Sequence, residues 1–502
     1  MPVATLTLDP AFVVAPVNRR TFGAFVEHMG RCVYTGLYEP GHPSADEDGF
    51  RTDVLELVRE LGVSVVRYPG GNFVSGYRWE DGVGPVEDRP TRLDPAWRSV
   101  ETNAFGLHEF LRWTAKAGVE PMMAVNLGTR GMQEAIDLHE YCNHPGGTAL
   151  SDLRRRNGAA EPFGISMWCL GNEMDGPWQL GHKSAEEYGR LAATTARALR
   201  QFDPSLELVA CGSSHRQMPT FGAWEATVLE HAYDDVDFIS AHAYYENRGD
   251  TASFLASSVD MDRFIDDVVA AADFVRAKEG RTKRLAISFD EWNVWYVSRV
   301  PDQLPEQWQE APRISEEAYT VADAVVVGSL LITLLRHSDR VTSACLAQLV
   351  NTISVIRTEP GGPAWRQATF HPFAVAARHA QGEVLRAELT GPTYPTATYG
   401  DVPCVDATAT HDVETGATTV FAVNRSQDGP VVLEVATHGL GALRLVEGLT
   451  LTDPDLTAAN RETEPDRVAP RPLTATVEDG LLRVELPAVS WSCLRLAPAA
   501  QG

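Results

Sequence analysis

Short apolar runs alternate with helical patterns over the first three quarters of the chain. Many of the runs are rich in β-branched residues, and most are followed by apolar positions at three- and four-residue spacing, such as Phe264, Val268 and Ala272. Eight strands, with helices following the first seven, predict an α/β fold of the (β/α)8 TIM-barrel type over residues 18–375. The predicted strands are 21–26, 64–68, 121–126, 166–170, 207–211, 238–243, 284–289 and 343–349. The predicted helices are 53–61, 106–117, 132–141, 185–201, 224–231, 261–279 and 314–337.

Beyond about residue 375 the helical periodicity disappears. Short alternating runs separated by Gly, Pro, Asp and Asn take its place, a pattern typical of an all-β sandwich. We predict a C-terminal, jelly-roll-like sandwich made of residues 376–502 and 1–17, in which the early strand 4–8 pairs with the later ones. Segment 453–472, rich in Pro, Asp and Glu, is predicted to be an exposed loop. The later predicted strands are 418–424, 431–437, 443–451, 473–477 and 481–486.

Composition and charge exclude several classes of partner. The 502 residues carry 68 acidic against 43 basic side chains, a formal charge of −25, so neither a nucleic-acid footprint nor a polybasic membrane contact is expected. The longest apolar uncharged run, 324–335, is too short to span a bilayer and predicts a buried helix. Residues 1–14 lack the charge and apolar core of a secretion signal, and the seven cysteines are dispersed. These features predict a cytoplasmic protein.

Polar side chains follow all eight predicted barrel strands at their C-terminal ends. Such ends form one rim, where barrel enzymes place their chemistry. Two of the ends carry a glutamate beside an asparagine or tryptophan, namely Glu173 after the fourth strand and Glu291 after the seventh. The polar residues at the rim are Glu27, His28, Arg67, Asn72, Asn126, Asn172, Glu173, Ser213, Ser214, His242, Tyr244, Asp290, Glu291 and Gln348.

A carboxylate pair is the minimum equipment for cleaving a glycosidic bond. One carboxyl group protonates the leaving oxygen and the other attacks the anomeric carbon. Most glutamates in a chain of this length are surface charges or ion-pair partners. Two of them at the ends of barrel strands, on opposite sides of the mouth, favour the catalytic interpretation. The sequence has no His, Asp or Glu cluster with metal-ligand spacing, and this chemistry needs no metal or other cofactor.

Long motifs across the barrel resemble those of the α-L-arabinofuranosidases of glycoside hydrolase family 51. They include RYPGGNFVSGYRWEDGVG at 67–84, WCLGNEMDGPWQLGH at 168–182 and FDEWNVWY at 289–296, with shorter matches at 27–31, 124–131 and 344–351. The predicted C-terminal sandwich resembles that of the family in position and length only. Segments 285–289 and 298–313 differ in detail from the family pattern, which could alter contacts with the leaving group.

The resemblance implies a retaining exo-hydrolase that removes terminal arabinofuranose from arabinan, arabinoxylan or their oligosaccharides. It implies that Glu173 is the general acid/base and Glu291 the nucleophile. A homo-oligomer, a hexamer, is also implied. The resemblance further implies that Asn172 binds the sugar 2-OH, that Tyr244 and Arg67 orient Glu291, and that Glu27, Asn72 and Gln348 bind the furanose hydroxyls.

Several rim residues have a structural alternative. His242 is as well explained by a structural hydrogen bond as by a ligand contact. Stacking on sugar is favoured for Trp97, Trp178 and Trp295, whereas Trp292 is expected in the core. Asp290 adjoins Glu291 on a strand and is therefore expected to point the other way. Gly70 and Gly71 lack the Lys or Ser/Thr of a phosphate loop, and close approach of their backbone to substrate explains them.

Two other functions stay open from the sequence. The same machinery could act on another sugar, such as a β-D-xyloside or a galactofuranoside. A non-catalytic carbohydrate-binding barrel is the alternative from another class, and the intact glutamate pair argues against it.

Overall fold

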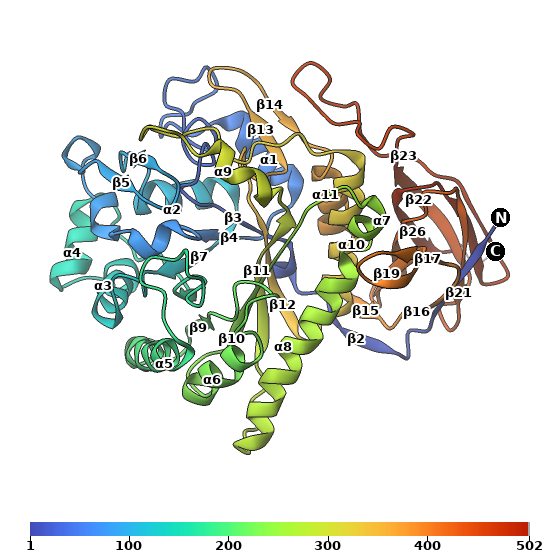
Figure 1. Cartoon of the computed structure of the whole chain (residues 1–502), viewed down its shortest axis with the longest axis horizontal. Helices are drawn as coiled ribbons and strands as arrows, with labels where there is room; N and C mark the ends of the chain where they lie inside the picture. The colour runs from blue at the N-terminus through green and yellow to red at the C-terminus, as the bar shows by residue number, and fades with distance from the viewer. Residues whose placement is uncertain (500–502) are drawn as a thin grey trace.

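The computed structural model describes residues 1–499 and contains a closed parallel barrel of eight strands followed by antiparallel sheets. The predicted fold class is therefore confirmed. Around the barrel the strand order is β10-β11-β12-β3-β4-β7-β8-β9. Figure 1 places this barrel on one side of the molecule and the sandwich, with both chain termini, on the other. The barrel strands are β3 (Gly23–Phe25), β4 (Val65–Tyr68), β7 (Glu120–Val125), β8 (Met167–Leu170), β9 (Glu207–Ala210), β10 (Phe238–Tyr245), β11 (Ala286–Val294) and β12 (Val341–Ala347).

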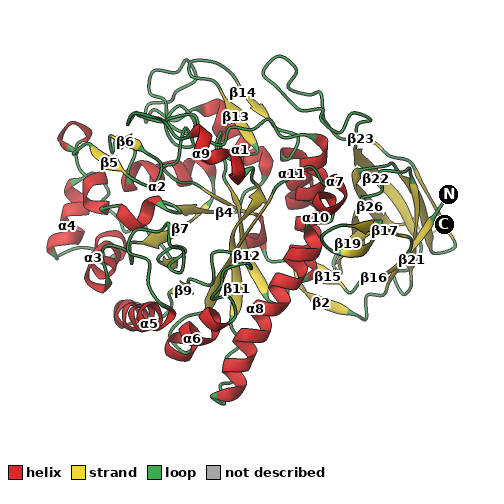
Figure 2. Cartoon of the chain, viewed as in Figure 1, coloured by secondary structure: helices red, strands yellow, loops and turns green. Residues whose placement is uncertain are grey.

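Helices surround the barrel because their apolar faces cover the outer sides of the strands. Figure 2 shows this red layer around the yellow strands, and few helices beside the sandwich. The α-helices are α1 (Thr52–Leu61), α2 (Leu107–Ala117), α3 (Met132–Asn143), α4 (Ala149–Arg156), α5 (Ala185–Phe202), α6 (Ala223–Ala232), α7 (Thr251–Leu255), α8 (Ser258–Lys278), α9 (Val300–Gln303), α10 (Val321–Arg336) and α11 (Phe370–His379).

The connections at the C-terminal ends of the barrel strands carry additional small elements. The longest of these connections follows β4 and builds one wall of the barrel mouth. The elements in these connections are η2 (Phe73–Gly76), η3 (Trp79–Gly82), η4 (Val86–Asp88), β5 (Arg92–Asp94), β6 (Ser99–Glu101), η5 (Val297–Arg299), β13 (Ile356–Thr358) and β14 (Ala364–Arg366). The helix η1 (Arg19–Phe22) leads into the first barrel strand.

Two sheets form the sandwich, in the orders β16-β1-β21-β25-β24 and β2-β15-β19-β20-β26-β22-β23. The predicted pairing of the early strand is confirmed, because β1 runs parallel to β21 and antiparallel to β16. In Figure 1 this blue strand lies beside β21. The strands are β1 (Val3–Leu8), β2 (Val13–Pro16), β15 (Glu383–Leu385), β16 (Glu388–Thr390), β19 (Val405–Asp412), β20 (Ala417–Asn424), β21 (Val431–Thr437), β22 (Leu443–Leu451), β23 (Arg471–Pro472), β24 (Ala475–Glu478), β25 (Leu481–Leu486) and β26 (Ser490–Pro498). A separate hairpin joins β17 (Thr393–Thr396) and β18 (Gly400–Pro403).

Helix α10 lies between the barrel and the sandwich and contacts both. Its residues are buried on all sides, which confirms the buried helix predicted from the run 324–335. At Gly328 an added Cβ would lie 2.1 Å from the Trp491 ring, so glycine is required for the helix to approach β26. Among the described residues, no helix combines the length and apolar character that crossing a bilayer requires.

One predicted helix start is wrong, and one predicted exposed loop is only partly exposed. The helix predicted at 314–337 begins only at Val321, because Thr320 caps it by exchanging hydrogen bonds with Asp323. Segment 453–472, predicted to be exposed, is partly buried. Asn460 is 1% exposed and Val468 2%, and the segment packs on the chain entering α10 through a bridge between Thr320 and Ala459.

Candidate active site

A cavity of about 430 Å³ opens at the C-terminal ends of the barrel strands. The closed parallel barrel explains its position, because all eight strands end at the same rim. Nine of the twelve predicted site residues line it: Glu27, Asn72, Trp97, Glu173, Trp178, Tyr244, Glu291, Trp295 and Gln348. The other three lie directly behind this wall. Arg67 and His242 contact the lining residues Glu291 and Glu173, and Asn172 accepts a hydrogen bond from Arg67.

Glu291, on β11, is held by a donor on each carboxylate oxygen. Arg67 donates from Nη1 to Oε1 at 2.7 Å, and the Tyr244 hydroxyl donates to Oε2 at 2.7 Å. Burial and the charge of Glu291 raise the pKa of Tyr244 well above its ordinary value, so the phenol stays protonated and donates. The arrangement suits an ionised carboxylate and fixes its orientation.

Glu173 follows β8 and has different surroundings. His242 Nδ1 lies 2.9 Å from its Oε1, and the Trp178 indole donates to its Oε2 at 2.8 Å. Burial and the nearby charge of Glu291 raise the pKa of Glu173, although the hydrogen bond with His242 opposes them. Its backbone has φ +44°, in the left-handed region that non-glycine residues rarely occupy. Such strain is found where surrounding contacts hold a functional side chain in place.

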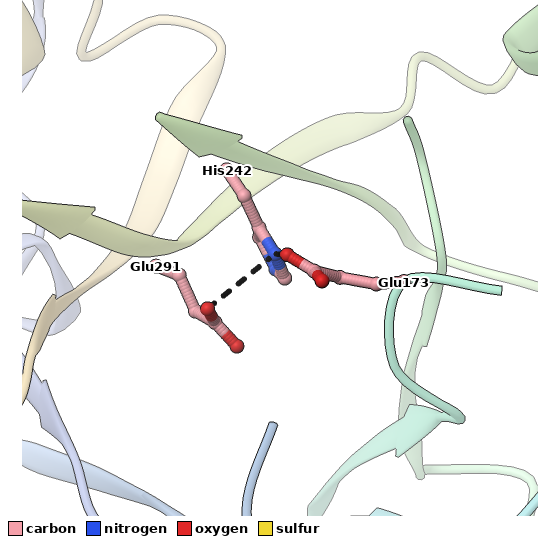
Figure 3. A group of neighbouring side chains, drawn as sticks. All are labelled: Glu173, His242 and Glu291. Carbon is pink, nitrogen blue, oxygen red and sulfur yellow. Dashed lines mark hydrogen bonds and ion pairs between the residues drawn. The ribbon is translucent and has the colours of Figure 1, made fainter. Parts of the chain in front are cut away.

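The two glutamates and His242 point toward one another. Figure 3 shows the Glu291 carboxylate approaching from a strand and the Glu173 carboxylate from a loop, with the imidazole beside them. One ligand atom from each of Glu173, His242 and Glu291 lies within 4.8 Å of the others. The fold therefore brings two carboxyl groups together although they are far apart in the sequence.

Glu27 lies on the inner wall of the cavity, enclosed by donors. Its Oε1 accepts from the Phe73 backbone N–H and from Trp97 Nε1, both at 2.9 Å, and its Oε2 accepts from Gln348 Nε2 at 3.3 Å. Burial raises its pKa to about 8. An added Cβ at Gly71 would lie 2.5 Å from Glu27 Oε2. The Gly71 backbone therefore lies against this side chain, and it also lines the cavity, where its close approach to substrate stays a prediction.

The burial of the Glu27 carboxyl group leads to a prediction about pH and stability. Between its ordinary pKa and about 8, the folded chain keeps a proton on Glu27 that the unfolded chain releases, so this group's contribution to stability falls as pH rises. The substitution Glu27→Gln removes the titration, and the free Oε1 of Gln348 can accept from the new amide. We expect the melting temperature of the variant relative to wild type to rise from pH 5 to pH 8, measured by calorimetry. A difference that stays constant over this range would contradict the prediction.

Two polar atoms near the cavity are free to bind a ligand. Asn172 accepts from Arg67 Nη2 at 2.6 Å through Oδ1, while its buried Nδ2 has no hydrogen-bond partner within residues 1–499. The same holds for Oε1 of Gln348 in the described part of the chain. A buried polar atom without a partner is costly unless a ligand or water satisfies it.

The tryptophans have separate roles. Trp178 is 46% exposed and lies parallel to His215, with ring centroids 6.1 Å apart. Trp295 lines the cavity and packs edge-on against Tyr244. Trp97 also lines it but is only 6% exposed and binds Glu27. Trp292 is fully buried and stacks near Phe373, which confirms the prediction of a core residue.

The expectation for Asp290 is wrong. Its Oδ1 lies 2.8 Å from His242 Nε2, and its Oδ2 lies 3.8 Å from Arg67 Nε, so it faces the same interior as Glu291. The reason is a β-bulge in β11. Between Phe289 and Trp292 this strand advances three residues while the paired positions on β12 advance two, and the pairing with β10 shifts by one residue in the same region. The extra residue breaks the alternation that places neighbours on opposite faces.

Sequence reasoning missed part of the cavity wall. The missed residues come from connections after the barrel strands, and their place in those connections was the available signal. Those missed altogether are Met29, His215, Gln217, Arg248, Val297 and Ile353. Gly71 and Ser214 also face the cavity, and the sequence places both at the rim.

The group formed by Glu173, His242 and Glu291 has metal-ligand atoms close together, but its bonding does not suit a metal. Both nitrogens of His242 face carboxylates, so neither presents a lone pair to an ion. Arg67 and Tyr244 already occupy the oxygens of Glu291. The three residues therefore form a hydrogen-bonded cluster and a poor metal site.

The bonding of this cluster predicts that turnover does not depend on a divalent ion. Dialysis against EDTA should leave the rate of aryl glycoside hydrolysis unchanged, with untreated enzyme as the control. Loss of activity that one divalent ion restores would overturn the prediction.

Comparison with known proteins gives consistent matches. Residues 57–283 match the family model described as alpha-L-arabinofuranosidase 1 domain, and residues 290–490 match the alpha-L-arabinofuranosidase C-terminal domain. An intracellular exo-alpha-(1->5)-L-arabinofuranosidase of Streptomyces lividans is 61% identical over 100% of this chain and 76% of its own length. An exo-alpha-(1->6)-L-arabinofuranosidase of Bifidobacterium longum is 56% identical, covering 98% of this chain and 97% of its own length.

Solved structures agree with the sequence matches. A family 51 alpha-L-arabinofuranosidase from Bifidobacterium longum superposes with a TM-score of 0.95 at 51% identity, covering 99% of both chains. An alpha-L-arabinofuranosidase from Thermotoga maritima, solved as an arabinose complex, gives a TM-score of 0.87 at 33% identity over 98% of this chain and 99% of its own.

Proposed function

The chain belongs to the α-L-arabinofuranosidases of glycoside hydrolase family 51, and we propose that it releases terminal α-L-arabinofuranose by a retaining double displacement. In this proposal Glu291 attacks the anomeric carbon and forms a glycosyl-enzyme. Glu173 first protonates the leaving oxygen and then removes a proton from the incoming water.

One observation carries the proposal, namely that Glu173 and Glu291 have carboxylate oxygens within 4.8 Å of each other beside the cavity. Retaining enzymes hold their carboxyl groups about 5–5.5 Å apart, whereas inverting enzymes leave about 6.5–9.5 Å for a water molecule. The short separation favours direct attack by a carboxylate.

The surroundings of the two glutamates support different roles. A nucleophile must be ionised and aimed, and Arg67 and Tyr244 donate to both oxygens of Glu291. A general acid must hold a proton, and burial and the charge of Glu291 raise the pKa of Glu173. When Glu291 becomes an ester in the glycosyl-enzyme, its charge disappears, so Glu173 then becomes a stronger acid and ionises to act as the base.

The remaining cavity groups suit a furanose ring. The free Nδ2 of Asn172 can donate to the sugar 2-OH, a contact that strengthens toward the transition state. Glu27 and Gln348 lie on the inner wall with Asn72, where they can bind the other hydroxyls. On the outer side, Trp178 presents an exposed face on which the leaving sugar can stack.

The substrate class follows from the family, and its details are part of the proposal. Arabinofuranosyl oligosaccharides with α-(1→5) linkages are the proposed substrates, since several relatives bear that linkage in their names. The (1→6) relative from Bifidobacterium longum makes the second linkage the alternative to compare. An intracellular location is proposed on the same names. A homo-oligomer, a hexamer by family resemblance, is also proposed, and light scattering would measure its mass.

The stereochemistry of the first product tests the mechanism. Hydrolysis of an aryl α-L-arabinofuranoside in an NMR tube should release α-arabinofuranose before it equilibrates with the β-anomer. The separation of the two carboxyl groups in a complex should stay near 5–5.5 Å. An initial β-anomer would contradict double displacement. A panel of xylosides and galactofuranosides should be turned over more slowly than the arabinofuranoside.

A further inference from the structure

Asp290 occupies a buried position that the two-glutamate mechanism does not use. It is 1% exposed and enters the barrel interior because of the bulge in β11. Arg67 lies 3.8 Å away and the Ser288 hydroxyl donates to its Oδ2 at 3.2 Å. Burial would raise its pKa, but Arg67 and His242 outweigh burial and hold the pKa below its usual range. Asp290 is therefore an ionised carboxylate inside the barrel.

His242 lies between two carboxyl groups. Its Nδ1 is 2.9 Å from Glu173 Oε1 and its Nε2 is 2.8 Å from Asp290 Oδ1. A neutral imidazole has one N–H and one lone pair, and a lone pair facing an ionised carboxylate makes no hydrogen bond. With Glu173 ionised, both contacts are satisfied together only when both ring nitrogens carry a proton, whereas a protonated Glu173 could also donate to a neutral ring. Glu291 Oε2 lies 3.6 Å from Nδ1 as well, and this further carboxylate favours a proton on Nδ1. The chain of contacts thus runs from Asp290 through His242 to Glu173.

We propose that Asp290 is a positioning residue that keeps His242 doubly protonated, so that His242 Nδ1 always donates to Glu173 Oε1. This inference rests on the acid/base role proposed for Glu173. Burial of His242 opposes a charge, but Glu291, Asp290 and Glu173 outweigh it and raise the pKa of His242 to about 10. The imidazolium then persists through the neutral range.

The first consequence concerns which oxygen of Glu173 carries the proton. Since His242 Nδ1–H donates to Oε1, the proton that Glu173 transfers is placed on its other oxygen, Oε2. That oxygen faces Trp178, which lines the cavity together with Glu173. The proton is therefore held on the oxygen beside Trp178, where we expect the leaving group to lie.

The second consequence concerns charge. The groups facing Glu173 and His242 come from strands β4, β10 and β11 and from the connections after β3 and β8. With Glu173 protonated, the positive charges of Arg67 and His242 balance the negative charges of Asp290 and Glu291. Without the negative charge of Asp290, the buried imidazolium would lose its proton. The ionised form of Glu173 would then lose its direct, stabilising contact with the imidazolium cation of His242. The titratable and charged groups concerned are Arg67, Tyr244, Asp290, Glu291, Asp175 and the more distant Glu27.

The substitution Asp290→Asn tests the proposal by the sign of one shift. The side-chain oxygen of Asn should face Arg67, and its NH2 group should donate to His242 Nε2. His242 is then neutral, and its Nδ1–H still donates to Glu173. The alkaline limb of kcat/KM for 4-nitrophenyl α-L-arabinofuranoside should then move up by about one pH unit or more. Suppose instead that His242 is neutral in the wild type, or that it stays charged in the variant. The substitution then removes only the negative charge of Asp290, and the alkaline limb moves to lower pH. A downward shift or no shift overturns the proposal.

Two controls accompany this measurement. Ser343→Ala alters a buried polar residue on the neighbouring strand β12, whose hydroxyl has no partner within residues 1–499, and should leave the limb in place. Glu173→Ala, assayed with a dinitrophenyl substrate, should lose the alkaline limb. If the limb survives there, the acid/base assignment fails, which is a result distinct from failure of the Asp290 proposal.

A direct observation keeps the proposal testable if Asp290→Asn does not fold. A neutron structure of the wild-type enzyme near pH 7 should show deuterium on both Nδ1 and Nε2 of His242. Deuterium on one nitrogen only would refute the proposal without reference to any variant.

Discussion

Glu291→Ala should lose activity on every substrate, by about 10⁴-fold or more in kcat. Without this carboxylate no glycosyl-enzyme forms, whatever the leaving group. Arg67 and Tyr244, which donate to Glu291 in the wild type, would be left facing an empty site. Steady-state rates with an alkyl, a 4-nitrophenyl and a dinitrophenyl arabinofuranoside measure the loss, which should be of similar size for all three.

Glu134→Gln is a matched control for this substitution. Glu134 is another buried glutamate, on helix α3 behind the barrel wall, and it does not line the active-site cavity. The Glu134→Gln variant, in which a neutral amide of the same size replaces the carboxyl group, should retain wild-type turnover. Substantial residual activity of Glu291→Ala on any of the three substrates would show that another group is the nucleophile.

Glu173→Ala should produce a loss that depends on the leaving group. This change removes the proton donor of the first step and the base of the second. A dinitrophenolate leaves without protonation, so its glycosylation step should survive, whereas an alkyl arabinofuranoside should lose about 10²–10⁴-fold. Hydrolysis of the glycosyl-enzyme should then limit turnover, and stopped-flow measurement should detect a burst of dinitrophenol.

Azide provides the second measurement on Glu173→Ala. The anion needs no general base, so it should accelerate turnover of the dinitrophenyl substrate. It attacks the glycosyl-enzyme from the face opposite Glu291, and two inversions should give the α-azide. In Glu291→Ala, any rescue should instead give the inverted β-azide. An α-azide and a leaving-group dependence in Glu291→Ala, with a β-azide from Glu173→Ala, would reverse the assigned roles.

The periodicity of apolar residues was sufficient to predict the barrel and the existence of the sandwich. Eight alternating units predict a closed parallel sheet because each helix must bury its apolar face against the strands. The same closure brings all strand ends to one rim. For this reason Glu173 and Glu291 could be paired from the sequence, although strands β9 and β10 lie between them along the chain.

Local sequence was less informative about boundaries and loops. The apolar pattern before α10 continues through Ile314 and Tyr319, yet the helix starts after Thr320, where the side chain of a buried aspartate satisfies the cap. Segment 453–472 has a polar composition, but its contacts with the chain entering α10 bury part of it. The cap is local in the sequence, whereas segment 453–472 is buried by contacts distant in the sequence.

The protonation pattern of the site depended on tertiary structure throughout. Whether Asp290 faces the barrel interior is set by one extra residue in β11 relative to β10 and β12, a property of pairing between strands that no single strand encodes. His242, on β10, acquires its two carboxylate partners only when the closed barrel brings the end of β8 and strand β11 near it at the mouth. Residue types and strand ends therefore predict which groups meet, whereas register and burial determine which of them hold a proton.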